Sequence, residues 1–247
     1  MRCSMTIALS IVCVLGLHAR ADDDVKAVIE KAIKAHGGEQ NLTKYQATQQ
    51  TAKGVLSLQG MDLEFTATIS NQLPDKVREE IHLKLMGQKI DVVRVFNGKD
   101  GWESAMGTTR DFGDAEMKEA KNNMFENYAE SLVPLLKDKD LTVKLIGDDK
   151  VDGKPVVGIK VSGKDEKEVK LYFDKDSGLL LKSERKGLGP SGVEVVSEAF
   201  NYDYKDVNGV KQPTKQVAKH DGAKFIELTI TDIKVLEKLE DSTFAKP

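Results

Sequence analysis

Cysteine is scarce in this sequence, and its placement excludes two kinds of chemistry. The chain has two cysteines, Cys3 and Cys13, and both lie close to its start. The rest of the chain therefore has neither a disulfide framework nor a thiol nucleophile. Cys13 lies inside an apolar run rather than at its end, so we interpret it as ordinary leader sequence and not as a lipid-modified cysteine.

Long apolar runs are also lacking, apart from one short run near the start. Residues 7–17 are mostly apolar, follow the basic Arg2 and precede a small-x-small cleavage pattern at residues 19–21. The run is too short for a spanning helix, which needs about 20 apolar residues. This layout predicts a secretory signal peptide over residues 1–21, followed by an exported, single-domain mature chain over residues 22–247. The alternative is an N-terminal anchor that is retained.

The sequence has no large excess of positive charge. It contains 37 Lys and Arg against 40 Asp and Glu, and loss of Arg2 and Arg20 with the signal peptide would leave 35 basic residues. The charges are interspersed, and no long basic patch stands out. This composition argues against nucleic acid as a partner and against tight binding to anionic lipid surfaces.

Motifs for catalysis, nucleotide binding and metal binding are missing too. The chain has no Gly-x-Ser-x-Gly elbow, no Walker loop and no Gly-x-Gly-x-x-Gly. Three histidines, His36, His82 and His220, are far apart and lack metal-binding spacing. We therefore expect a non-catalytic protein without a metal or other cofactor. An enzyme in which these histidines meet acidic residues in one pocket is the least favoured alternative.

Two segments have the pattern of helices. The first has Asp22–Asp24 as its expected N-cap and ends at Gly37-Gly38, and the second has Asp114 as its expected N-cap. Pro134 should end or kink the second helix. The apolar residues of the first recur at helical spacing: Val25, Val28, Ile29, Ala32 and Ile33.

Most of the remaining chain alternates apolar and polar residues with a period of two, as half-buried strands do. Turn signals such as Asn97–Gly101, Asn208-Gly209 and Asp221-Gly222 separate these runs at hairpin spacing. About eleven such strands predict an antiparallel sheet that curls. The fold class is therefore mainly β (α+β): a half-open antiparallel β-barrel with an apolar interior, an N-terminal helix and a mid-chain lid helix.

The stretch LYFDKDSGLLLKSE, residues 171–184, allows two interpretations. Asp174, Asp176 and Gly178 resemble the start of a calcium-binding loop. An EF-hand, however, needs glycine at position six and glutamate at position twelve, whereas here glycine is fifth and Arg185 is twelfth. The Asp and Gly residues suit a tight turn between two strands, which is the interpretation that we favour.

Three segments carry a resemblance to a known family: FNGKDGW (96–102), LYFDKDSGLLLKSE (171–184) and NGVKQPT (208–214). With a signal peptide and a helix that ends in Gly-Gly, the chain resembles the periplasmic outer-membrane lipoprotein-sorting proteins, the LolA/LolB-like carriers. The resemblance implies a half-open barrel whose apolar interior holds lipoprotein acyl chains. It also implies an arginine in the cavity that gates the lid, for which Arg78, Arg94 and Arg110 are the candidates among the strands.

These observations favour a monomeric periplasmic carrier or binding protein for lipoprotein acyl chains or another apolar ligand. The alternative is a non-catalytic envelope sensor or interaction module of the same fold that docks an inner- or outer-membrane protein. Methionine on a lid suits an adaptable apolar surface. The candidate ligand-binding residues are Met61, Leu63, Phe65, Leu83, Leu85, Val93, Val95 and Trp102 on strands, and Met117, Met124, Phe125 and Tyr128 on the lid helix.

Overall fold

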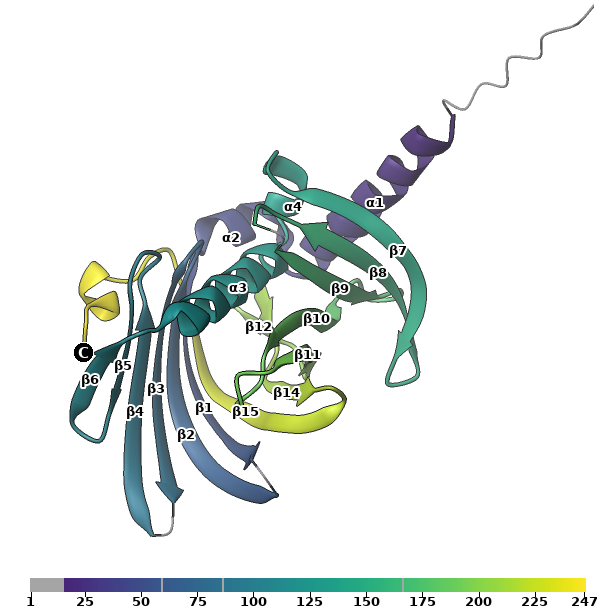
Figure 1. Cartoon of the computed structure of the whole chain (residues 1–247). Coiled ribbons are helices and arrows are strands. Elements are labelled where there is room, and N and C mark those ends of the chain that lie inside the picture. Colours follow the sequence, from purple (N-terminus) through teal and green to yellow (C-terminus); the bar gives the residue numbers. More distant parts are fainter. Residues whose placement is uncertain (1–15, 59, 86, 166) are drawn as a thin grey trace, which may run out of the picture.

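A computed structural model describes residues 16–58, 60–85, 87–165 and 167–247. Most of the signal peptide expected over residues 1–21 lies outside these ranges. The described chain is predominantly β (Figure 1). The strands are β1 (Ala47–Leu58), β2 (Met61–Gln72), β3 (Lys76–Leu85), β4 (Gln88–Phe96), β5 (Gly101–Ala105), β6 (Thr108–Asp111), β7 (Thr142–Val151), β8 (Lys154–Ser162), β9 (Glu168–Asp174), β10 (Leu180–Leu188), β11 (Glu194–Tyr202), β12 (Lys205–Val207), β13 (Val210–Gln212), β14 (Lys215–His220) and β15 (Ala223–Leu236).

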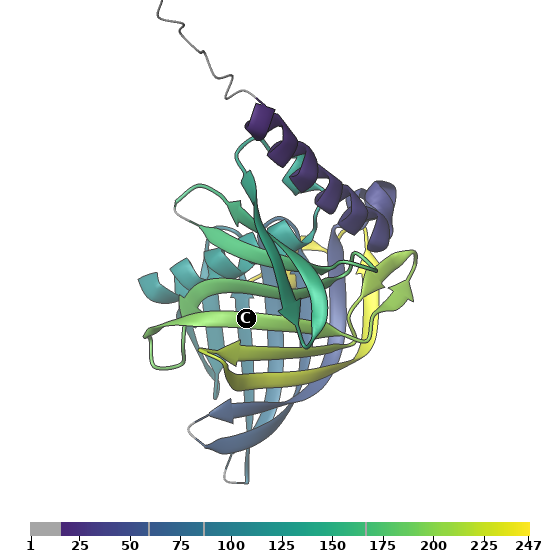
Figure 2. The same ribbon diagram turned by 90° about the vertical axis from the view of Figure 1, so that its right-hand side faces the viewer.

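Thirteen of these strands form one antiparallel sheet in the order β6-β5-β4-β3-β2-β1-β15-β14-β11-β10-β9-β8-β7, and β12 pairs with β13 separately. Two meanders, β1 to β6 and β7 to β11, are joined through β14 and β15 at the centre. The sheet curls strongly, yet in the described part of the chain its edges β6 and β7 do not pair (Figure 2). The expected half-open barrel is thus confirmed, with more strands than the alternation of the sequence predicted.

The helices are α1 (Gly16–Ala35), α2 (Gly38–Lys44), α3 (Asp114–Glu130), α4 (Pro134–Lys137) and a 3₁₀ turn, η1 (Asp241–Phe244). In the full chain the described part of α1 already includes residues 16–21, so the N-cap at Asp22–Asp24 expected for the mature chain stays a prediction. Residues 17–21 contain leucine and alanine, which favour helix, so the helix continues through the cleavage pattern. None of the helices in the described residues combines the length and the apolar character that a membrane span requires.

The mid-chain helix α3 begins one residue earlier than expected. Its N-cap is Gly113 rather than Asp114, and the Glu116 side chain accepts a hydrogen bond from the Gly113 amide at 2.9 Å. Aspartate within the first turn still favours the helix, because it lies near the positive end of the helix dipole. The predicted effect of proline is confirmed: α3 ends at Glu130, and Pro134 begins the separate helix α4.

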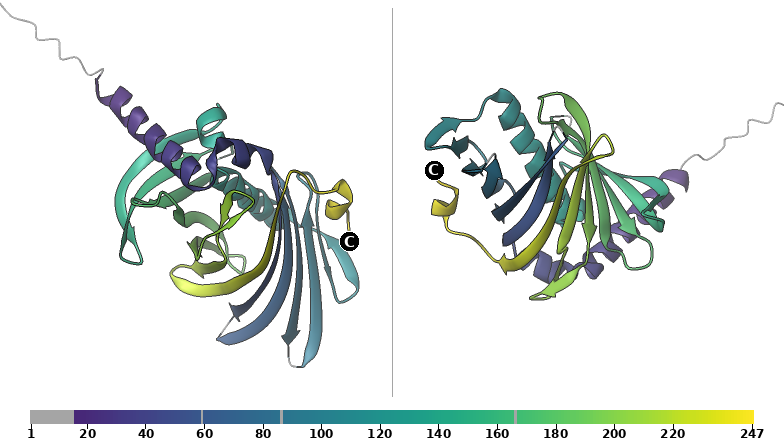
Figure 3. Two further views of the ribbon diagram at one scale, coloured as in Figure 1. Left: turned by 180° about the vertical axis from the view of Figure 1, so that it is seen from behind. Right: turned by 90° about the horizontal axis from the view of Figure 1, so that it is seen from below.

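Two apolar clusters attach α3 to opposite parts of the sheet. Near its C-terminal end, Ala129 and the following Leu132 join the main core, in which α1 and α4 pack on β8 to β10. Nearer its start, Ala120 and Met124 pack on Phe96 of β4. Figure 3 shows α3 within the curve of the sheet. The helix therefore bridges the two halves of the concave face, which places it over anything that binds there.

The stretch from Asp174 to Gly178 forms a turn, as predicted. The Asp174 Oδ1 atom accepts hydrogen bonds from the amides of Asp176 and Ser177 at 3.0 and 2.7 Å. Gly178 has φ +78°, which only glycine adopts readily, and it lies against Lys31 of α1. The turn between β9 and β10 thus also positions the N-terminal helix.

We expect Gly37→Ala to lower the free energy of unfolding by about 2–4 kcal/mol. Gly37 has φ +125°, and a Cβ atom there would lie 2.1 Å from the Gly209 carbonyl oxygen. Gly38 is the matched control: its φ is +83°, but a Cβ atom would meet nothing within 4 Å. Gly38→Ala should therefore cost only about 1 kcal/mol. Urea denaturation of both variants checks this, and equal losses would contradict it.

Candidate functional site

The pairing of the strands determines which residues face the inside of the curved sheet. Residues directly opposite each other in an antiparallel pair share a face. Gln50 pairs with Ile69, Ile69 with Glu79, and Glu79 with Arg94, so these four residues form one row across β1 to β4. The whole row borders the cavity described next, which identifies its face as the concave one.

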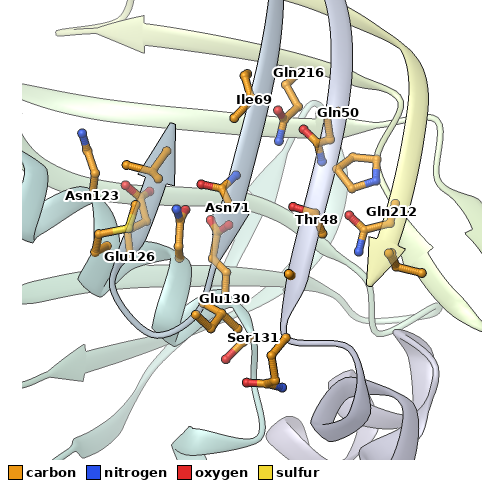
Figure 4. A pocket seen from close by; sticks show the side chains of 18 of the residues that line it. Thr48, Gln50, Ile69, Asn71, Asn123, Glu126, Glu130, Ser131, Gln212 and Gln216 are labelled. Carbon is orange, nitrogen blue, oxygen red and sulfur yellow. The ribbon is translucent and has the colours of Figure 1, made fainter. Parts of the chain in front are cut away.

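A cavity of about 510 Å³ lies on the concave face between α3 and the adjoining ends of β1 to β4. Its lining is rich in amides and carboxylates, and Figure 4 shows several of these side chains directed into it. Apolar side chains such as Ile69 and Met124 border the cavity, but they do not dominate it. The sequence predicted an apolar interior, and at this end of the strands the interior instead combines polar and apolar side chains. The polar lining residues include Thr48, Gln50, Asn71, Glu79, Arg94, Glu119, Asn123, Glu126, Asn127, Glu130, Ser131, Asn201, Gln212 and Gln216.

A buried network of charged and polar side chains holds α3 to β10. Arg185 of β10, whose side chain is 7% exposed, lies 2.8 Å from the Glu119 carboxylate and 2.7 Å from that of Glu126. It also binds Asn123, and the Ser183 hydroxyl donates to Glu126 at 2.6 Å. We call these five residues the Arg185 network. It attaches one face of α3 to the sheet by polar contacts, beside the cavity.

Two carboxyl groups at the cavity have raised pKa values. Burial, together with the negative charge of neighbouring Glu126, raises the pKa of Glu130 to about 8. Burial also raises the pKa of Glu79, although nearby Arg94 acts in the opposite direction. In the described part of the chain, neither carboxyl has an ion-pair partner within 4 Å, whereas Glu119 and Glu126 are paired with Arg185. Among the described residues, the cavity thus contains two carboxyl groups that make no direct ion pair, although Arg94 and Arg185 lie near enough to act on them.

Towards the opposite ends of β1 to β4 the same concave face is apolar. The residues of this face are mostly half-buried, and they alternate with exposed residues such as Glu64 and Lys84 on the convex side. We call this surface the apolar trough. Its residues, placed on one face by the pairing of the strands, are Leu56, Met61, Leu63, Phe65, Ile81, Leu83, Leu85, Ile90, Val92, Ile226 and Leu228.

The structure separates the predicted ligand-binding residues into groups. Met61, Leu63, Phe65, Leu83 and Leu85 lie together in the apolar trough. Their proposed contact with a ligand stays a prediction, because no ligand is present.

The other predicted strand residues lie elsewhere. Val93 pairs with Glu80, and Val95 pairs with both Arg78 and Trp102, so these valines and the tryptophan belong to the convex face. Val95 nevertheless borders the cavity along the β4 backbone.

The four predicted lid residues do not share one face of α3. Met117 and Met124 pack against the Phe96 cluster, and Met124 also lines the cavity. Phe125 packs against the main core on the other side of the helix. The Tyr128 hydroxyl donates to Asp138 at 3.0 Å. The face that points to the cavity and to β10 is instead the polar one that carries Glu119, Glu126 and Glu130, which the search for apolar stripes overlooked.

Of the three arginines nominated from the sequence, only Arg94 lines the cavity. Arg78 lies on the convex face, where it pairs with Glu80 at 2.6 Å, and Arg110 is half exposed between Glu103 and Glu116. Arg110 thus contacts the start of α3 through Glu116, but the buried arginine that binds this helix beside the cavity is Arg185, which the sequence did not single out. Because its neighbours Lys182, Glu184 and Lys186 are charged, the sequence of this strand looks like that of a solvent-exposed one.

Of the three histidines named from the sequence, only His36 borders the cavity, which acidic residues such as Glu130 also line. Both ring nitrogens of His36 contact the backbone: Nδ1 lies 2.8 Å from the Ala32 oxygen, and Nε2 accepts from the Leu180 amide at 3.4 Å. His82 is exposed beside Asp91 on the convex face. His220 stacks on Phe225, with ring centroids 4.1 Å apart. Among the described residues, no cluster of three or more His, Cys, Asp or Glu side chains could hold a metal ion.

Comparison with known proteins supports the architecture. No protein-family model matches the sequence, and a search of curated proteins gives no match. The solved structure of a domain described as an outer membrane lipoprotein-sorting protein from Vibrio parahaemolyticus is similar, with TM-score 0.55, 12% identity, and coverage of 91% of this chain and 97% of the other. A LolA superfamily protein from Nitrosomonas europaea gives TM-score 0.56 at 12% identity, covering 90% and 97%. A DUF1329 family protein from Desulfovibrio piger gives 0.55 at 15% identity, covering 90% and 97%.

These likenesses concern the fold. The chain has the architecture of LolA superfamily proteins and lipoprotein-sorting domains, as the three sequence segments indicated. At this low sequence identity the comparison does not transfer a ligand or a site residue to this chain. Both are therefore inferred from the cavity and the trough.

Proposed function

We propose that the mature chain is a non-catalytic periplasmic carrier or binding protein for an amphiphile with an acyl chain, bound non-covalently on the concave face. The apolar trough is the observation that carries this proposal. It presents half-buried aliphatic and aromatic side chains, and it lies on the same face of the strands as the residues that line the cavity. A surface of this kind is stabilised when an apolar molecule covers it. The proposal takes residues 22–247 as one monomeric domain.

The size of the trough suits a flexible chain. Burial of one methylene contributes about 0.8 kcal/mol, so roughly ten methylenes would contribute about 8 kcal/mol before the entropic cost of binding. Met61 at the far end of the trough is 46% exposed, which leaves room for further contact. Methionine is flexible and polarisable, so it adapts to chains of different length.

The helix α3 is the element that would regulate entry. It crosses the concave face between the Phe96 cluster and the main core, and the Arg185 network holds the side that faces the cavity. When the helix moves, polar groups released from these contacts can form hydrogen bonds with water instead. An apolar contact has no such replacement and loses its whole burial energy. We therefore propose α3 as the lid of the site.

Leu83→Asp is expected to weaken the binding of a fluorescent fatty acid to delipidated mature protein by about 10- to 100-fold, because it removes a buried leucine contact and adds a charge. Lys84→Asp is the matched control. It introduces the same side chain next to Leu83 but on the exposed convex face, and should leave binding unchanged.

Fluorescence titration checks this prediction. Loss of affinity in both variants, or in neither, would contradict a ligand in the trough. If the native protein takes up no acyl probe at all but co-purifies with one membrane protein, the alternative of a protein-docking module replaces the carrier proposal.

A further inference from the structure

We infer that the cavity beneath α3 receives the polar head of the bound amphiphile, and that this head carries an amine rather than a phosphate or carboxylate. The inference rests on the proposed function and adds the orientation and the chemical class of the ligand.

The orientation follows from the concave face itself. Along β2, Asn71 and Ile69 line the cavity, while Phe65, Leu63 and Met61 continue the same face into the apolar trough. The six residue steps along the strand from Ile69 to Leu63 span roughly 20 Å. One surface thus changes from hydrogen-bonding to apolar along the strands. A molecule with a polar head and an apolar chain matches it in one direction only, with its head under α3.

The charged residues of the cavity indicate which class of head group it would bind. Arg185 is the shared ion-pair partner of Glu119 and Glu126, and supplies one positive charge to the two carboxylates. The two basic residues of the lining have partners outside the set of unpaired carboxyls, since Arg94 lies 3.6 Å from Glu103 and Lys211 lies 3.5 Å from Asp206.

Glu79 and Glu130 then remain, on β3 and α3, without ion-pair partners within 4 Å among the described residues. Burial raises the pKa of Glu130 to about 8 and so keeps it protonated while the cavity is empty. A bound ammonium head would supply a counterion that lets these carboxyls ionise, whereas an anionic head would lose its hydration and would oppose that ionisation.

The uncharged lining is consistent with the same head. Figure 4 shows Glu130 extending from α3 towards Asn71 on β2, with Thr48 and Gln50 on the neighbouring strand. Hydroxyl and amide oxygens accept hydrogen bonds from the N–H groups of an amine, as carboxylates do.

Three single-chain probes of equal chain length test the inference: dodecylammonium, dodecyl maltoside and dodecyl sulfate, each titrated calorimetrically below its micelle concentration into delipidated mature protein. Dodecylammonium should bind at least tenfold more tightly than dodecyl sulfate, with dodecyl maltoside between them. Glu79→Gln and Glu130→Gln should each reduce the ratio of ammonium to sulfate affinity at least threefold. Glu64→Gln, on the exposed convex side of β2, should leave the ratio unchanged.

The outcomes separate this inference from the proposed function. Equal binding of the three probes, or tightest binding of the sulfate or the maltoside, would overturn the amine head while supporting an acyl-chain site. An ammonium preference that survives in both Gln variants would overturn the assignment to Glu79 and Glu130. Failure of all three probes to bind would overturn the proposed function together with the inference. Circular dichroism of each variant shows that it is folded.

Discussion

Replacing Arg185 by leucine is expected to lower the free energy of unfolding of the mature protein by about 3–5 kcal/mol at pH 7. The guanidinium is nearly inaccessible and is the shared partner of Glu119 and Glu126. Its removal leaves two carboxylates without a counterion in a site from which water is largely excluded. The loss arises less from the missing attraction than from the unpaired charges that remain. Urea denaturation monitored by circular dichroism measures it.

Two further variants test this origin. Arg110→Leu removes an arginine that also joins two carboxylates, Glu103 and Glu116, but whose side chain is 50% exposed. Its cost should be about 0–1 kcal/mol, because solvent screens such pairs.

Adding Glu119→Gln and Glu126→Gln to Arg185→Leu should recover much of the lost stability, since no buried charge then remains unpaired. Equal losses of stability in Arg185→Leu and Arg110→Leu would show that burial does not increase the contribution of the Arg185 ion pairs. No recovery in the triple variant would indicate lost packing instead.

How far the sequence predicts this fold depends on what each strand faces. β2 and β3 were predictable because Leu63, Phe65 and Leu83 alternate with polar residues, and that alternation reflects a trough on one side and solvent on the other. β1 was missed. Its first inward residues, Thr48 and Gln50, line the polar cavity, so at that end both faces of the strand are polar and the period of two disappears. The polar inward residues of β1 thus explain both the missing alternation in the sequence and the polar side chains in the cavity.

The candidate site was predictable only where it is apolar. The environment of Arg185 is supplied by Glu119 and Glu126 on a helix about sixty residues earlier in the chain, and no local pattern encodes that contact. Whether Val93 or Trp102 points inward depends on the register across the turn at residues 97–100, which the composition of the turn does not specify. The strand alternation therefore identified the trough, while the polar lid contacts required the three-dimensional arrangement.

Glu130→Gln is expected to make the protein more stable than the native form at alkaline pH, by about 2–4 kcal/mol at pH 9. Burial and the charge of Glu126 raise the pKa of Glu130 from 4.5 to about 8 in the folded protein. The folded state therefore holds a proton that the unfolded state has released. This stabilising contribution is complete below pH 4.5 and is lost as the pH rises through about 8. Glutamine resembles the protonated acid and never ionises, so its advantage should be absent near pH 5 and should grow with pH.

The matched control is Glu126→Gln, one turn earlier on α3. Glu126 is bound by Arg185 and Ser183, so its replacement removes satisfied contacts and should destabilise the protein at pH 9. The two substitutions change the same atoms on the same helix and are expected to have opposite signs. Urea denaturation of both variants and the native protein, from pH 5 to pH 9, gives the comparison. A Glu130→Gln variant that gains no stability relative to native protein across that range would mean that Glu130 is ionised in solution.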